Sequence, residues 1–125
     1  MTLTQAAIAY VHAVCPSNKL VTPYNAALDA GNLTQLKVLA TESVAANQET
    51  AKELDQGLWP EEVKADIGTV RDIYFADIPP TQQVAAAASM DAVKAIAWPD
   101  ATAASTASQR LRSRLGLSAD QMKGC

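Results

Sequence analysis

The chain has 125 residues, a formal net charge of −3 and an isoelectric point near 5.0. This length suits a single domain, residues 1–125, built around one hydrophobic core. The acidic balance argues against a nucleic-acid-binding protein, because such domains are usually strongly basic. No apolar stretch approaches the roughly 20 residues needed to cross a bilayer. Much of the hydrophobic content is alanine and only 5% of the residues are aromatic, which favours closely packed helices.

The first 30 residues predict two helical stretches with a proline between them. Thr2 or Thr4 can cap the first stretch with its side-chain oxygen. We expect Pro16 to end this helix or to start the next one, because the residue before a proline avoids the α region. The second stretch runs from about 17 to 30, where Pro23 either kinks the helix or restarts it.

The longest helix is expected to begin after Asn32 and to end at Gly57. Gln35 occupies the reciprocal position of a capping box, and a glycine is a common residue just beyond a helix end. In the middle of this helix the inner face becomes small and polar at Ser43 and Asn47. We expect close helix packing with a hydrogen-bonded amide here. The alternative is a narrow polar cavity in the bundle.

The stretch 59–75 is the most clearly amphipathic part of the chain. Four apolar residues recur at spacings of four, three and four: Val63, Ile67, Val70 and Tyr74. This spacing places them in one stripe down a helix that begins at Pro60, with Trp59 folded back on the first turn. Asp66 falls on the other side with most of the charged residues, where we expect water to solvate it.

The pattern becomes ambiguous after this helix. Pro79 and Pro80 either kink the helix or start a separate one, and Ser89 can cap a short helix. A last main helix is predicted from about 101 to 115. The whole pattern predicts an all-α protein: an up-and-down bundle of four to five main helices, with short helical or irregular pieces around residues 79–98.

Two cysteines, Cys15 and Cys125, stand almost at opposite ends of the chain. We expect a disulfide that joins the last residue to the end of the first helix. Closing a loop of this size restricts the unfolded chain by about 4–5 kcal/mol in the entropic model. A terminal cysteine is also exposed to oxidation unless it is paired. The pair predicts an oxidising compartment, and the alternative is two unrelated thiols in a reducing cytosol.

The chain lacks the spacing of a catalytic, cofactor or metal motif. His12 is the only histidine, and no acid lies at helical spacing to orient it, so we expect it at the surface or half-buried. Two cysteines and one histidine make a poor zinc-ligand set, and the glycines are scattered. Three arginines alternate and therefore fan out around a helix: Arg110, Arg112 and Arg114. We predict no catalytic residues, no metal site and no cofactor.

The two tryptophans are the candidates for a binding rim. Trp59 and Trp98 each precede a proline and an acidic residue at a helix entrance, and we expect them to be more exposed than the other aromatic residues. Gathered on one rim, they would form a site for a protein or ligand. The alternative, which we favour, is that each tryptophan seals an end of the bundle.

Several segments resemble small secreted proteins or lipoproteins of actinobacteria. The segments are YVHAVCP, DAGNLTQL, LWPEEV with VRDIYFAD, and ASQRLRSRLGL followed by a final cysteine. They cover nearly the whole chain but mark helix boundaries rather than chemistry. The resemblance implies export, a lipid anchor through a cysteine upstream of residue 1, and pairing of Cys15 with Cys125. It implies no activity.

The leading functional hypothesis is an extracytoplasmic helical module, secreted or anchored as a lipoprotein, that binds an unknown protein or small ligand at the cell envelope. The first residues lack the basic n-region of a signal peptide, so we expect any leader to have been removed. One alternative is a small enzyme that uses carboxylates from separate helices. Another is a cytosolic helical partner protein with free thiols.

Overall fold

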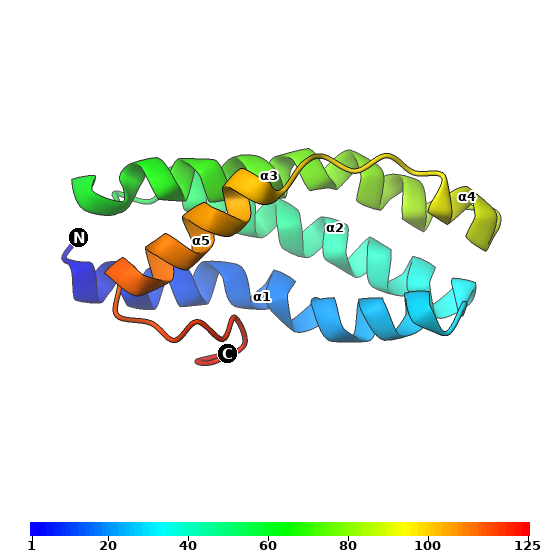
Figure 1. The fold of residues 1–125 in the computed structure, drawn as a ribbon, viewed down its shortest axis with the longest axis horizontal. Helices are drawn as coiled ribbons and strands as arrows, with labels where there is room; N and C mark the ends of the chain where they lie inside the picture. Colours follow the sequence, from blue (N-terminus) through cyan, green and yellow to red (C-terminus); the bar gives the residue numbers. More distant parts are fainter.

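The computed structural model describes residues 1–125 and contains five helices and no strands. The helices are α1 (Leu3–Asp29), α2 (Leu33–Gln56), α3 (Glu61–Ala85), α4 (Met90–Lys94) and α5 (Thr102–Arg114). The three long helices run along the length of the molecule, and α5 lies obliquely across the half that holds the N-terminus (Figure 1). The predicted all-α bundle is therefore confirmed.

The ends of the long helices follow the local chemistry of the sequence. Thr2 and Gln5 form a reciprocal capping box at the start of α1. Asn32 accepts a hydrogen bond from the backbone of Gln35 and caps α2, after a turn in which Gly31 takes a φ of 64° that side chains rarely allow. These short connections make α1, α2 and α3 consecutive antiparallel neighbours.

The prolines do not divide the helices as expected. α1 continues through Pro16 and Pro23, so the prediction of two separate stretches is wrong, and α1 rather than α2 is the longest helix. Val14 and Ser17, on either side of Pro16, are both buried. Their packing offsets the roughly 3 kcal/mol that a proline costs inside a helix. α3 likewise continues through its two prolines to residue 85.

The chain becomes short and irregular only after α3. Ser89 caps α4 by accepting a hydrogen bond from the backbone of Ala92, as the sequence predicts. Residues 95–101 then run without helix along the molecule to α5. α5 closes with Gly116 at a φ of 69°, which is typical of a residue just after a helix.

Two separate hydrophobic clusters hold the bundle together. The larger joins α1, α2, α3 and α5 through side chains such as Tyr10, Leu54, Ile67 and Leu111. The smaller joins the other ends of α1, α2 and α3 to α4, and includes Leu36 and Val84. The stability of the fold therefore comes from two apolar ends rather than from one continuous core.

A partly buried ion cluster fixes α5 on α3. Asp66 is only 5% exposed, so the prediction that water solvates it is wrong. Arg110 donates three hydrogen bonds to its carboxylate, the shortest at 2.7 Å, and Arg114 lies 3.3 Å from the same group. These bonds from Arg110 lower the pKa of Asp66. Arg110 and Arg114 are one helical turn apart and share a face, whereas Arg112 points to the tail, so the predicted fanning out holds only for Arg112.

The pairing of Asp66 predicts a pH-dependent stability. Because the pKa of this carboxyl is lower in the folded than in the unfolded protein, its contribution is present above about pH 4 and is lost as the pH falls through the folded pKa. We expect Asp66→Asn to lower the free energy of unfolding by about 1–2 kcal/mol at pH 7, a modest value because solvent reaches both guanidinium groups. Urea unfolding between pH 2 and 7 measures it.

Asp72→Asn is the matched control, because Asp72 also contacts an arginine on α3 but its side chain is 69% exposed. We expect this substitution to change the free energy of unfolding little at any pH. Equal effects of the two substitutions would contradict a special role for the buried carboxylate.

Candidate functional site

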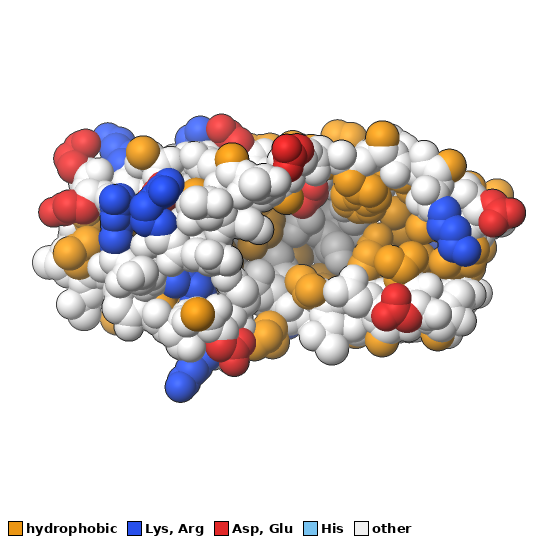
Figure 2. All heavy atoms as spheres, in the orientation of Figure 1, with side chains coloured by type: hydrophobic (Ala, Val, Ile, Leu, Met, Phe, Trp, Pro, Cys, Tyr) orange, Lys and Arg blue, Asp and Glu red, His pale blue; other side chains and the backbone are white.

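The fourth position of the bundle is only half filled. α5 has 13 residues, whereas the three long helices have 24 to 27. At 1.5 Å per residue, α5 covers about 20 Å of a groove that is nearly 40 Å long. Between α5 and the far end lies an open cleft of about 530 Å³, visible as the hollow in the middle of Figure 2.

The lining of the cleft combines uncharged polar side chains with apolar surface. It has 22 residues, drawn from all four of the larger helices, from the segment before α5 and from the C-terminal tail. More than half of them carry a hydroxyl or amide group. The apolar remainder includes Leu20, Val70 and Ile73. Such a lining offers many hydrogen bonds to a ligand while leaving apolar surface for its carbon atoms.

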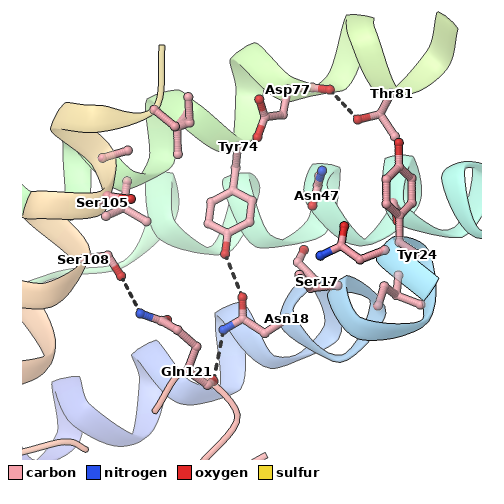
Figure 3. A pocket seen from close by; sticks show the side chains of 18 of the residues that line it. Ser17, Asn18, Tyr24, Asn47, Tyr74, Asp77, Thr81, Ser105, Ser108 and Gln121 are labelled. Carbon is pink, nitrogen blue, oxygen red and sulfur yellow. Dashed lines mark hydrogen bonds between the residues drawn. The ribbon is translucent and has the colours of Figure 1, made fainter. Parts of the chain in front are cut away.

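The polar break in the middle of α2 forms the back of this cleft. Ser43 and Asn47 both line it, and Figure 3 shows Asn47 between the facing side chains of α1 and α3. The expected hydrogen-bonded amide is absent, because the side chain of Asn47 makes no hydrogen bond, and the two residues line an open cleft rather than the narrow cavity of the alternative. The physical reason is the short α5, which leaves no partner helix to cover this part of α2.

A chain of hydrogen bonds forms the wall of the cleft next to α5. The hydroxyl of Tyr74 donates to Asn18 at 3.3 Å, and the amide of Asn18 donates to the carbonyl of Gln121 at 3.2 Å. The side-chain amide of Gln121 in turn donates to Ser108 at 3.3 Å (Figure 3). The hydroxyl of Ser108 also contacts the hydroxyl of Tyr10. The network joins α3, α1, the tail and α5, so it fixes the shape of this wall.

The tail is held in this wall by the disulfide. Cys125 is bonded to Cys15 on α1, as the sequence predicts, and no free cysteine remains. The buried guanidinium of Arg112 donates to the backbone carbonyls of Ser118 and Asp120, which turns the chain after α5 back toward α1. The tail thereby brings Gln121 into the cleft lining together with Met122.

Asp77 on α3 is the only residue with a formal charge at neutral pH among those that line the cleft. Partial burial raises the pKa of its carboxyl. Two tyrosines, Tyr24 on α1 and Tyr74 on α3, face the same space, and burial raises the pKa of each phenol. Both phenols therefore stay protonated near neutral pH and can donate hydrogen bonds.

The structure does not bring the two tryptophans to the same place. Trp59 is 8% exposed, belongs to the larger hydrophobic cluster and donates from its indole nitrogen to the carbonyl of Leu54 at 2.8 Å. Trp98 is 47% exposed and lies at the cleft in the segment before α5. Trp59 thus covers the end of α2 from within the core, and only Trp98 is placed to touch a ligand in the cleft.

The other candidate residues lie outside the cleft. His12 is at the surface, 3.3 Å from a carboxylate oxygen of Glu53. No group of three or more histidine, cysteine, aspartate or glutamate side chains is placed to hold a metal ion. The three arginines of α5 are engaged with Asp66 or with the tail.

Comparison with protein-family models, with characterised proteins and with solved structures finds no match to this chain. None of its helices combines the length and the apolar character that crossing a membrane would require.

Apart from Ser43, Asn47 and Trp98, the residues that line the cleft are not predicted as a site by the sequence. Their signal in the sequence is weak: polar residues at helical spacing on inner faces, such as Ser105 and Ser108 on α5. Tyr74 packs against the larger hydrophobic cluster, as its place in the predicted stripe implies, and it also lines the cleft. Only the alignment of four helices brings these positions together.

The disulfide predicts a large change in stability. We expect Cys125→Ser to lower the free energy of unfolding by up to about 4 kcal/mol, because a link across 110 residues no longer restricts the unfolded chain. Urea unfolding of the oxidised proteins measures this. Adding a reductant should destabilise the natural protein and leave Cys125→Ser unchanged. An unmoved unfolding curve in the variant would show that the tail contributes nothing to the fold.

Proposed function

We propose that this protein is an extracytoplasmic binding protein whose cleft takes a small molecule. The observation that carries the proposal is the open cleft of about 530 Å³ between α5 and the far end of the bundle. Its volume is in the range of small-ligand sites, which typically measure about 300–1,000 Å³. Its hydroxyl and amide groups are numerous, and hydrophobic side chains lie among them.

The position of the cleft within the fold supports this proposal. The two hydrophobic clusters lie at the ends of the bundle, so the polar middle is not needed to fill a core. Polar residues in the middle of inner helix faces cost stability unless they are hydrogen-bonded or wet. Their presence on three helices at the same level is the arrangement expected of a binding site.

We propose that the protein is located in the cell envelope or in the medium outside the cell. The disulfide between Cys15 and Cys125 supports it, because such bonds form and persist in oxidising compartments. The resemblance to small secreted proteins and lipoproteins of actinobacteria points the same way. Under this proposal a leader is removed from the mature chain, which is free or held by a lipid upstream.

The alternative functions find less support in the site. An enzyme that uses two carboxylates requires both to converge on its substrate, and the cleft lining holds one, Asp77. A cytosolic partner with free thiols is at odds with the paired cysteines. Binding without a covalent step is the function that these residues support best.

Thermal unfolding in the presence of a chemically mixed panel tests the proposal. The panel contains neutral polyols (glucose, trehalose), organic cations (choline, putrescine) and organic anions (citrate, benzoate), each at 10 mM. We expect at least one compound to raise the melting temperature by several degrees, as a ligand at tens of times its Kd would do for a domain of this size.

Two variants of α5 locate the bound compound. Ser105→Trp places a bulky ring at the cleft and should abolish the shift, since Ser105 lines it. Thr106→Trp is the matched control, because Thr106 is exposed on the same helix outside the cleft. No shift with any compound, or a shift that survives Ser105→Trp, would contradict the proposal.

A further inference from the structure

Asp77 is a carboxylate with no partner of opposite charge. The cleft around it is lined by residues from every larger helix, and none of them is a lysine, arginine or histidine. No salt bridge involves Asp77 and no hydrogen bond reaches its carboxylate; the hydroxyl of Thr81 donates to its backbone carbonyl. Partial loss of water is the sole cause of its raised pKa.

Asp66, three helical turns earlier on α3, is a buried carboxylate with a structural role and serves as a comparison for Asp77. Asp66 is bonded to Arg110 and lies 3.3 Å from Arg114, so its charge is matched within the protein. Asp77 has no such match although the chain has ten lysines and arginines to draw on. We therefore expect a bound ligand, rather than the protein itself, to supply the positive charge that pairs with Asp77.

We propose that the ligand of the cleft is a small organic cation, an amine or quaternary ammonium compound, whose charge pairs with Asp77. This inference rests on the proposed binding function and names the chemical class of the ligand. A neutral ligand that displaced water from Asp77 would leave the carboxylate still less solvated, whereas a cation replaces that water with an opposite charge.

The aromatic residues of the cleft suit the same ligand. Tyr24, Tyr74 and Trp98 line it, which is half of the six aromatic residues in the chain. Figure 3 shows Tyr74 and Tyr24 entering the cleft from opposite sides, from α3 and α1, near Asp77. The faces of such rings attract alkylammonium groups, and the attraction strengthens where water is excluded.

An anionic ligand fits the cleft less well. The one positive feature nearby is the N-terminus of α5, where the carboxylate of Asp100 already accepts hydrogen bonds from the backbone and hydroxyl of Thr102 at 2.9 and 2.7 Å. The lysine and arginine side chains on the face in Figure 2 lie away from the hollow. An anion would therefore meet Asp77 without a compensating charge.

Choline and 3,3-dimethylbutan-1-ol have nearly the same shape but only choline is charged, so comparing their affinities isolates the effect of ligand charge. Titration calorimetry of the oxidised protein at pH 7.5 compares the affinities of the two compounds, and a tenfold preference for the cation is the expected effect of its charge. Butylamine and butan-1-ol form a second pair for a primary amine. We expect the cation to bind more tightly than the alcohol in at least one pair, because only the cation interacts with Asp77.

Asp77→Asn keeps the shape of the side chain and removes its charge. It should weaken binding of the cation at least tenfold and leave the alcohol unaffected. The variant should fold, and its melting temperature should be no lower than that of the natural protein, because a partly buried unpaired charge is removed. Asp72→Asn, on the exposed side of the same helix, is the control and should leave cation binding unchanged.

Lowering the pH gives an independent readout. The titratable groups that face the cleft are Asp77, Tyr24 and Tyr74, since α2, α5 and the tail contribute none. Both phenols stay protonated below neutral pH, so binding of the cation should weaken only as Asp77 gains a proton. Cation affinity that does not fall toward pH 4 would overturn the proposal.

The remaining outcomes separate this inference from the proposed function. Equal affinity of cation and alcohol, or cation binding that survives Asp77→Asn, would overturn the choice of ligand class and leave a binding cleft. Binding of polyols or anions alone would do the same. If no compound of the thermal panel or of these pairs binds, both the inference and the proposed function fail.

Discussion

The structure depends on a mismatch of helix length. Three helices of 24 to 27 residues form the body of the bundle, and a fourth helix of 13 residues lies over one half of it. A full-length fourth helix would bury the groove between α1 and α3 and leave room for nothing else. The short helix instead completes a hydrophobic core at one end, while α4 closes the smaller core at the other. The open middle follows from this arrangement.

The elements that hold the short helix in place also shape the cleft. Asp66 binds α5 to α3 through Arg110, and the disulfide returns the tail from α5 to α1. The bridge therefore has two effects: it restricts the unfolded chain and it places Gln121 in the cleft wall. Loss of the bridge would affect the site as well as the stability of the fold.

Local chemistry in the sequence predicts most of the fold. Capping residues such as Asn32 and Ser89, the stripe around Ile67 and the cysteine pair all indicate what the structure contains. The prolines of α1 wrongly predict a break in the helix, because the free energy gained by packing the residues around them exceeds the cost of a proline inside a helix.

The site is much harder to predict than the fold. Whether Asn47 packs against a neighbour or faces a cleft depends on where a helix 55 residues later begins, and no local pattern contains that information. The same holds for the charges: Asp66 and Asp77 look alike in the sequence, yet one meets two arginines and the other none. Helix register across the bundle decides both cases.

Accessibility of the middle of α2 tests the central claim most directly. In the variant Asn47→Cys, iodoacetamide should alkylate the new thiol rapidly in the folded, oxidised protein, because residue 47 faces the open cleft. Ala51→Cys, one turn further along α2 and fully buried, should react only as fast as the protein unfolds. Equally slow labelling of the two positions would show that the bundle is closed and that the cleft does not exist in solution.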